Sequence, residues 1–167
     1  MTSQVMDRLQ RRAEHSGHAA MGGVQPKEML MSHLHVTPFL RNVLRADAAV
    51  SAVAALVMLL GGSALQSLLQ LPAWLLLGAG SALVAYVVFV TWLSQRDSVP
   101  RGLIWTLVVI NVGWAFDCAL LAFASWLQPS AWGHAFLGAH IVTVLVFAEL
   151  QYMALQRGRA SGVPAHA

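Results

Sequence analysis

The chain has 167 residues, of which 57% are hydrophobic and only 10% are charged. Soluble domains carry about 25% charged residues and about 45–50% apolar ones, so a water-soluble globule of this length would have too few charges to cover its surface. The single cysteine, Cys118, excludes an internal disulfide and a cysteine zinc cluster. The composition therefore indicates one membrane-embedded domain.

Residues 1–36 form the first distinct region of the sequence, and we expect them to be a cytoplasmic arm that is partly mobile. No apolar core follows the early arginines, so the arm does not have the pattern of a signal peptide. Residues 26–35 fit a short interfacial helix whose Met29, Leu30 and Leu34 dip into the lipid headgroups.

The histidines of this arm are the candidate metal ligands, namely His15, His18, His33 and His35, with methionines nearby. Imidazole and thioether ligands together suit copper. However, these pairs have no fixed scaffold and the predicted topology places them inside the cell, so we predict no bound metal. A bis-histidine haem needs two facing histidines at one depth, and only His140 is well immersed. We therefore expect no cofactor.

Four apolar stretches approach or exceed the roughly 20 residues that cross a bilayer as an α-helix. They cover residues 46–62, 73–93, 103–127 and 132–155. The separators are short and carry turn residues, so neighbouring helices must be antiparallel. The sequence therefore predicts an all-α polytopic membrane protein. Its four-helix up-down transmembrane bundle covers residues 37–157, and a cytoplasmic tail follows at residues 158–167.

Local patterns sharpen this map at several places. Thr37 followed by Pro38 is typical of an N-cap with proline at the first helical position, so we start the first long helix near Pro38. Residues 63–70 are predicted to form a short amphipathic turn of helix on the outer surface. Small residues at four-residue spacing predict close seams between helices. These pairs include Ser51 with Ala55 and Gly78 with Ala82.

The distribution of basic residues predicts the orientation. All ten lie before the first span, between the second and third, or after the fourth, and the other two loops carry no charge. The positive-inside rule then places both termini in the cytoplasm. We expect the membrane to be the inner membrane of a bacterium. The pI near 9.8 is explained by this topology and by attraction to anionic lipid, so the bilayer is the expected partner and nucleic acid is not.

Five polar side chains are predicted to lie at membrane depth, where ionisable groups usually face a partner or a cavity. They are Asp47, Asn111, Asp117, His140 and Glu149. Asp117 and His140 are equally distant from the turn between the third and fourth spans, so a hydrogen bond between them is allowed. Such a pair either joins two helices structurally or handles protons. A third alternative is that the two side chains do not meet.

Two further expectations concern the carboxyl groups. His140 and Glu149 are nine residues apart, about 180° around a helix, so they must face different neighbours. Asp47 lies about one turn inside the inner boundary, where Arg45, Arg101 or Arg157 is expected to neutralise it.

Three runs of sequence carry a resemblance to known proteins: Leu44–Ala48, Asn111–Trp114 and Val146–Tyr152. Together they resemble an uncharacterised family of small bacterial four-helix integral membrane proteins, over about residues 40–157. The resemblance implies no activity. The His- and Met-containing arm before residue 37 is then an addition to the common core and a place where a partner could be engaged.

No hydrolase, metalloprotease, P-loop or dinucleotide motif is present, so catalysis is not the first interpretation. We expect a non-enzymatic accessory or scaffolding subunit of a larger inner-membrane complex, such as a respiratory or photosynthetic assembly. The alternative is a self-associating transporter or channel with Asp117, His140 and Glu149 on a proton or ion path. A membrane enzyme with an unrecognised site is the third hypothesis.

Overall fold

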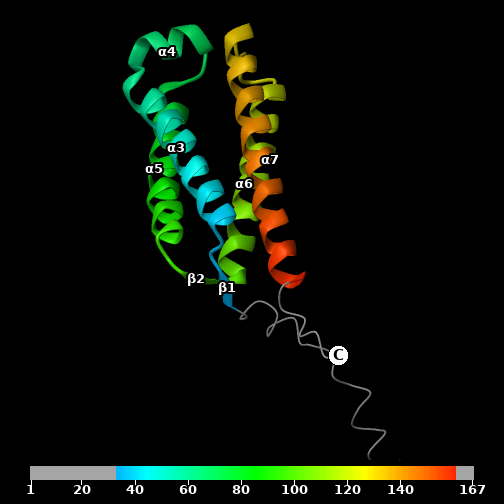
Figure 1. Ribbon diagram of the computed structural model, residues 1–167. Helices are drawn as coiled ribbons and strands as arrows, with labels where there is room; N and C mark the ends of the chain where they lie inside the picture. Colours follow the sequence, from blue (N-terminus) through cyan, green and yellow to red (C-terminus); the bar gives the residue numbers. More distant parts are fainter. Residues whose placement is uncertain (1–32, 161–167) are drawn as a thin grey trace, which may run out of the picture. The chain divides into compact units, whose positions relative to one another are not determined.

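The structure is a computed structural model that describes the backbone of residues 33–160 and the side chains of residues 33–157. Five α-helices and two short strands make up this part of the chain (Figure 1). In chain order the elements are β1 (His33–His35), α3 (Pro38–Leu60), α4 (Gly62–Leu69), α5 (Ala73–Ser94), β2 (Ser98–Pro100), α6 (Arg101–Phe123) and α7 (Ala131–Ala160).

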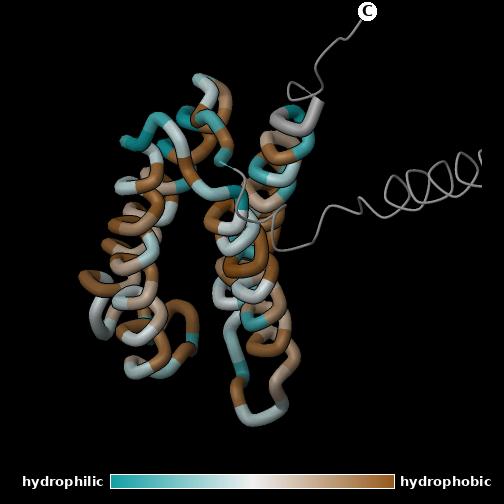
Figure 2. The backbone as a smooth tube through the Cα atoms, turned by 90° about the horizontal axis from the view of Figure 1, so that it is seen from below, coloured by the Kyte–Doolittle hydropathy of each residue, from teal (hydrophilic) through white to brown (hydrophobic). Residues whose placement is uncertain are grey.

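Four of these helices are long and apolar enough to cross a membrane, namely α3, α5, α6 and the Ala131–Arg157 part of α7. Hydrophobic residues accordingly dominate the tube along the long helices in Figure 2. The chain is therefore an all-α protein with four candidate membrane spans, as the sequence predicts. The third span ends at Phe123, earlier than predicted, and the loop before α7 is correspondingly longer.

The long helices form two antiparallel pairs. α3 packs mainly against α5, and α6 packs mainly against α7 (Figure 1). Between the pairs the principal contact is that of α3 with α7. The helix start at Pro38 is confirmed, because the Thr37 hydroxyl accepts a hydrogen bond from the Leu40 amide at 3.2 Å. The short helix predicted at residues 63–70 is confirmed as α4, which ends where Gln70 adopts a left-handed conformation (φ 54°).

The two strands tie the segment before α3 to the connection between α5 and α6 at one end of the bundle, which we call the strand end. β1 and β2 are antiparallel, and Leu34 pairs with Val99. The Val36 amide extends the contact by donating to the Asp97 carbonyl at 2.9 Å. The predicted interfacial helix is therefore wrong for its last residues, His33–His35, which pair with a partner strand instead. The remainder of the predicted arm lies outside the described residues.

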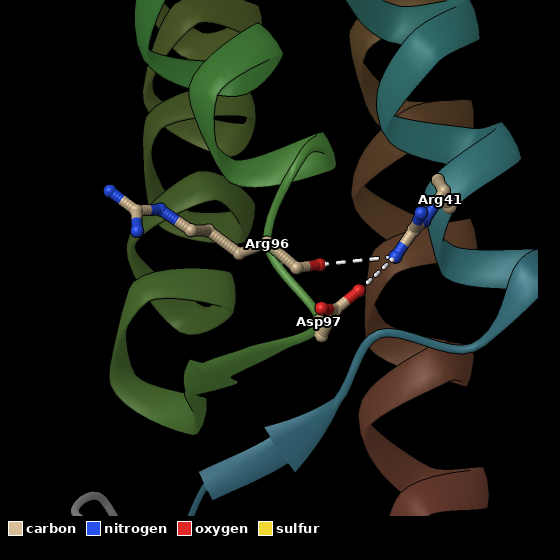
Figure 3. A network of polar contacts seen from close by, with 3 residues as sticks. All are labelled: Arg41, Arg96 and Asp97. Atoms are coloured by element: carbon tan, nitrogen blue, oxygen red, sulfur yellow. Dashed lines mark hydrogen bonds and ion pairs between the residues drawn. The ribbon is translucent and has the colours of Figure 1, made fainter.

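A polar contact reinforces the strand end from the first turn of α3. The Arg41 guanidinium donates to the Arg96 carbonyl at 3.3 Å and to the Asp97 carboxylate at 3.1 Å (Figure 3). The Arg101 guanidinium donates to the Leu155 carbonyl at 2.7 Å and so connects α6 with the end of α7. The described part of the chain therefore begins at β1 and finishes at the end of α7 on the same end of the bundle. Four antiparallel helices require this arrangement.

The opposite end, which we call the α4 end, is held by the loop before α7. The Ser130 amide donates to the Leu69 carbonyl at 3.0 Å, and the Ser130 hydroxyl donates to the Leu68 carbonyl at 2.5 Å. Gly133 is needed at this contact, because a Cβ atom there would collide with the Leu69 carbonyl oxygen. These bonds connect the α3–α5 pair to the α6–α7 pair.

The core divides into two hydrophobic clusters, one toward each end. The largest fully buried side chains are Leu40, Leu44, Leu93, Ile104, Leu107, Gln151, Val90, Val99 and Asp47. All of them lie between the strand end and the middle of the bundle, so packing is tightest there. Two members of this set, Asp47 and Gln151, are polar and mark the candidate site.

Candidate functional site

A buried cluster of polar side chains joins all four long helices. Asp47 of α3 is its centre and is only 1% exposed. Its Oδ2 atom accepts hydrogen bonds from the Tyr86 hydroxyl of α5 at 2.7 Å and from Gln151 Nε2 of α7 at 2.8 Å. Its Oδ1 atom accepts from the Ser51 hydroxyl at 3.3 Å. Asn111 of α6 completes the cluster by donating to the Tyr86 oxygen at 3.0 Å and to Gln151 Oε1 at 3.3 Å.

This central polar cluster lies within the four helices that are long and apolar enough to cross a membrane. Asp47 is nine residues, or about 14 Å, from the first residue of α3. Inside hydrocarbon no water satisfies a polar side chain, so groups that bond to one another across helices fix how those helices associate. Each long helix supplies at least one member, and the cluster therefore fixes the rotation of all four helices about their axes.

The prediction that an arginine neutralises Asp47 is wrong. The Asp47 carboxyl is bonded to neutral hydrogen-bond donors, and no ion pair of this residue is present among the described residues. Arg101 is bonded to the Leu155 carbonyl, and the Arg157 guanidinium lies over the Phe39 ring at 4.7 Å. Arg45 is exposed, and it lies two residues before Asp47 and therefore on a different face of α3.

A cavity of about 860 Å³ opens in the α4-end half of the bundle. Residues of α5, α6 and α7 supply most of its walls, among them Gly78, Ala82, Trp114, Asp117 and His140, and we call it the α5–α6 cavity. The walls are mostly apolar. The predicted seam at Gly78 and Ala82 is therefore wrong, because both residues are exposed and face this space, whereas the seam predicted at Ser51 and Ala55 is buried as expected.

A smaller cavity of about 320 Å³ lies between the α5–α6 cavity and the central polar cluster. It shares Ala82 and Trp114 with the larger space, and it is also lined by Ser51, Tyr86 and Asn111. The interior between α5 and α6 is thus loosely filled from the polar cluster toward the α4 end.

Two buried polar atoms in the wall of the α5–α6 cavity have no hydrogen-bond partner. They are Trp114 Nε1 and His140 Nε2. The other ring nitrogen of His140, Nδ1, lies 3.0 Å from the Phe136 carbonyl oxygen, one turn back along α7. A carbonyl oxygen only accepts, so Nδ1 carries the proton, and in the neutral ring Nε2 is an acceptor. Two residues that line the cavity therefore carry a buried polar atom without a partner among the described residues, an N–H donor in Trp114 and a ring nitrogen acceptor in His140.

The expected bond between Asp117 and His140 is absent. Both residues line the α5–α6 cavity, in agreement with their matched depth, but no hydrogen bond or ion pair joins them. The buried stripe of α6 includes Asn111, Ala115 and Cys118, and at 100° per residue Asp117 lies about 120° away from its centre. Asp117 is consequently exposed. Of the three alternatives raised by the sequence, the pair that does not meet is the one present.

Glu149 occupies the opposite face of α7 from His140, as their nine-residue separation predicts. Its side chain is exposed, whereas His140 is half-buried in the cavity wall. Glu149 is two residues, or about 3 Å, nearer the α4 end than Gln151. A carboxyl group therefore lies on the outer surface of the bundle at about the depth of the central polar cluster.

Three members of the cluster, namely Ser51, Tyr86 and Gln151, are not among the five polar side chains that the sequence places at membrane depth. Distance from the turn between α6 and α7 places Asn111 level with about Val146 and roughly level with Glu149, yet its partner on α7 is Gln151. Helical side chains tilt toward the N-terminus of their helix, so on antiparallel helices the side chains that meet come from Cα atoms at different levels. This tilt shifts the expected partner of Asn111 along α7 in the direction of Gln151.

The candidate metal ligands give no metal centre in the described part of the chain. His33 and His35 are exposed on the same side of β1, and no group of three His, Cys, Asp or Glu side chains between residues 33 and 157 could hold an ion. His15 and His18 lie outside the described residues. The expectation of no cofactor stays a prediction.

No protein-family model, curated protein or solved structure matches the chain. The resemblance noted from the sequence therefore stays a prediction, and the function has to be argued from the residues.

Proposed function

We propose that this protein is a non-enzymatic accessory or scaffolding subunit of a larger inner-membrane complex, of the kind found in respiratory or photosynthetic assemblies. The observation that carries the proposal is the exposed side chain of Glu149. An ionisable group at this depth is unfavourable against lipid and usually faces a partner or a cavity. Among residues 33–157 nothing covers the Glu149 side chain, so a neighbouring protein is the expected cover.

The surface around Glu149 has the form of a helix-docking ridge. Val142, Leu145, Val146 and Tyr152 are exposed by 63%, 44%, 51% and 36%. Each lies three or four residues from Glu149 or from another member of the set, so all of them share one face of α7. Apolar side chains at this spacing match a second transmembrane helix. We infer that the occupant is a transmembrane helix of another subunit, which places a hydrogen-bond donor or a basic side chain opposite Glu149.

The proposed orientation has both termini in the cytoplasm of a bacterial cell. The arginines of the described residues lie toward the strand end, and the α4 end of the described chain carries no Lys or Arg. Loops rich in Lys and Arg remain cytoplasmic. In a Cys118→Ser background, Ser63→Cys should react with an impermeant maleimide in spheroplasts, and Asp97→Cys should react only after permeabilisation. The opposite labelling pattern would overturn the orientation.

The assembly itself is tested by native mass measurement of the full chain extracted from its own membrane. We expect complexes that contain other polypeptides. Glu149→Ala should reduce their recovery at least several-fold, because the partner's polar group loses its counterpart. Ser81→Ala is the matched control, since Ser81 is an exposed polar side chain on α5, away from the ridge. It should leave recovery unchanged.

Each other outcome decides against the proposal. A monomer, or complexes that Glu149→Ala leaves intact, contradicts the docking ridge. A homo-oligomer favours the alternative, a transporter or channel that uses Asp117, His140 and Glu149. Within one chain these three residues form no continuous path, because Glu149 lies on the face of α7 opposite the cavity. Such a path would need a second copy to bring Glu149 to Asp117 and His140.

A further inference from the structure

We propose that Asp47 is an exchangeable proton-binding site inside the bundle, and that the Ser51 hydroxyl passes the proton between Asp47 and the smaller cavity. The site is separate from the Glu149 ridge and does not depend on the proposed function. The Asp47 side chain is 1% exposed, and the hydrogen-bond partners of its carboxyl group within the described chain are all uncharged.

The directions of the hydrogen bonds show which carboxyl oxygen can carry a proton. The Tyr86 oxygen and Gln151 Oε1 both accept from the Asn111 amide, so the Tyr86 hydroxyl and Gln151 Nε2 both donate to Asp47 Oδ2. An amide N–H cannot accept a hydrogen bond, and the Tyr86 hydrogen already points at Oδ2. A proton on Oδ2 would therefore meet two donors. Oδ1 remains, and its partner is the Ser51 hydroxyl at 3.3 Å.

The Ser51 hydroxyl can serve both charge states of Asp47. When the carboxyl group is ionised, the hydroxyl donates to Oδ1, as in the structure. When Oδ1 carries a proton, the new O–H donates to the Ser51 oxygen, and the Ser51 hydrogen turns to the Asp47 backbone carbonyl one turn back. A serine makes such a bond elsewhere in this chain, where Ser67 donates to the Ser63 carbonyl at 2.9 Å. Rotation of one hydroxyl group thus lets the cluster accept a proton with its other bonds unchanged.

The smaller cavity offers a route between this site and water. Ser51, Tyr86 and Asn111 line it, whereas Asp47 is one side chain removed from it. Its volume of about 320 Å³ is several times the roughly 30 Å³ that a water molecule occupies in the liquid, and hydroxyl and amide groups provide polar partners. A hydronium ion in the cavity transfers its proton to the Ser51 oxygen while the Ser51 hydrogen moves to Asp47 Oδ1. The products are one water molecule, an intact serine hydroxyl and a neutral carboxyl group.

The groups that face Asp47 from the other helices do not neutralise it. They are Tyr86 of α5 and Gln151 of α7, with Asn111 of α6 bonded to both, and Tyr86 is the titratable member. The described acidic and basic side chains of these three helices lie in the α5–α6 cavity wall, on the outer surface or near the two ends, namely Asp117, His134, His140, Glu149, Arg101 and Arg157. A carboxylate without a counter-ion is unfavourable in hydrocarbon. Metal cations require several oxygen ligands, whereas hydrogen-bond donors surround Asp47, so a proton is the cation that fits this site.

Infrared difference spectroscopy tests the proposal, because a protonated carboxyl group has a carbonyl band that a carboxylate lacks. The full-length protein in phosphatidylcholine nanodiscs is taken from about pH 10 to about pH 4, which spans the ordinary titration of carboxyl groups. An Asp47 band should appear reversibly while the amide bands stay unchanged. Asp47→Asn should remove this band. The matched control Asp117→Asn should retain it, since Asp117 lies outside the cluster, in the wall of the α5–α6 cavity.

Substitutions at Ser51 test the route. Ser51→Ala should shift the Asp47 band to higher wavenumber, because the carboxyl O–H loses its acceptor. After a pH jump the band should also form about tenfold more slowly, which corresponds to about one hydrogen bond lost from the transfer path. Ser51→Thr keeps a hydroxyl group and should restore both the position and the rate. Ser94→Ala should change neither, since Ser94 is a buried serine of α5 that donates to the Thr91 carbonyl at 2.8 Å.

The spectra decide the proposal even if Asp47→Asn does not fold, because the shift in Ser51→Ala identifies the same band. An Asp47 band that is present throughout this pH range, or absent throughout it, would overturn the proton site. A band that forms only together with a change in the amide bands would overturn it as well, since the proton would then break the cluster. An unchanged rate in Ser51→Ala would overturn the route. These outcomes leave the Glu149 ridge untouched, because that surface is assayed by recovery of a complex.

Discussion

The strand-end half and the α4-end half of the bundle are built from the same four helices, but their side chains fill the interior to different extents. In the strand-end half, all four helices surround completely buried side chains, among them Leu44, Leu93, Ile104 and Leu107. In the α4-end half, the two helix pairs are joined at their tips by Ser130, and the α5–α6 cavity remains between them. The central polar cluster lies at the boundary between these halves.

Side-chain size on α5 accounts for the difference. Toward the strand end this helix presents Val90 and Leu93, which are fully buried, whereas toward the α4 end it presents Gly78 and Ala82 to the space beside α6. Small residues allow lipid-embedded helices to approach closely, but they do not bring helices together by themselves. Where the ends of the helices are held by loop contacts, small side chains leave a cavity instead of a seam.

The largest effect is expected from removing the centre of the polar cluster. Asp47→Ala leaves the Tyr86 hydroxyl and the Gln151 amide buried without their acceptor. It should lower the free energy of unfolding by about 3 kcal/mol, with contributions from unsatisfied groups and the vacated volume. Unfolding by sodium dodecyl sulfate titration in mixed micelles measures it. Asp47→Asn is the control and should lose about half as much, because one acceptor oxygen remains. Equal stability of the Ala variant and the unaltered protein would show that the cluster contributes nothing.

A smaller effect is expected at the contact that joins the helix pairs at the α4 end. Gly133→Ala places a methyl group against the Leu69 carbonyl and 2.9 Å from Pro129 Cβ. Since one of the colliding atoms is backbone, the loop must shift, and a loss of about 2 kcal/mol is expected. The same titration measures it. Gly138→Ala serves as control, since no atom lies within 4 Å of its Cβ position. A similar stability of both variants would contradict the described loop contact.

Alanine substitutions at two glycines of α5 test which face of this helix is packed and which face borders the cavity. A Cβ at Gly80 would lie 2.9 Å from Leu59 Cγ and 3.1 Å from Met58 Cβ, whereas a Cβ at Gly78 meets no atom within 4 Å. Gly80→Ala should therefore destabilise the protein by about 1 kcal/mol. Gly78→Ala should stabilise it by about 0.5 kcal/mol through lower backbone entropy in the unfolded state. Thermal unfolding in nanodiscs measures which of the two variants is more stable. If Gly80→Ala were the more stable one, the cavity would not lie on the face of α5 that carries Gly78.

The smallest effect is expected at the surface of the strand end. The Arg41–Asp97 ion pair has a distance of 3.1 Å, but the Asp97 side chain is 94% exposed. Exposed ion pairs contribute about 0–1 kcal/mol and are screened by salt. Asp97→Asn should thus lower stability by less than about 0.5 kcal/mol, and the difference should vanish in concentrated salt. A salt-independent loss comparable to that of Asp47→Ala would show that the strand end depends on this pair.

Depth was predictable from the sequence, but rotation about the helix axis was not. Distance from the turn predicts Asp117 and His140 at one level, and both residues do line the α5–α6 cavity, yet Asp117 points about 120° away from the buried stripe of α6. The rotation was not evident because the long helices are apolar on all sides, so no polar face marks the side exposed to lipid. The contacts of Asp47 with Tyr86 and Gln151 escaped prediction for a related reason, since they depend on which helices become neighbours.

The sequence by itself determined what depends on short-range chemistry and on the bilayer. It specified four spans, the Thr37 cap at the start of α3, the short helix α4 and the location of the turns, because apolar length and turn residues act locally. Only the tertiary structure decided that Asp47, Tyr86, Asn111 and Gln151 meet, that His33–His35 pair with Ser98–Pro100, and that α5 and α6 leave a cavity. These features depend on the approach and rotation of segments far apart in the chain, which packing of the whole bundle sets.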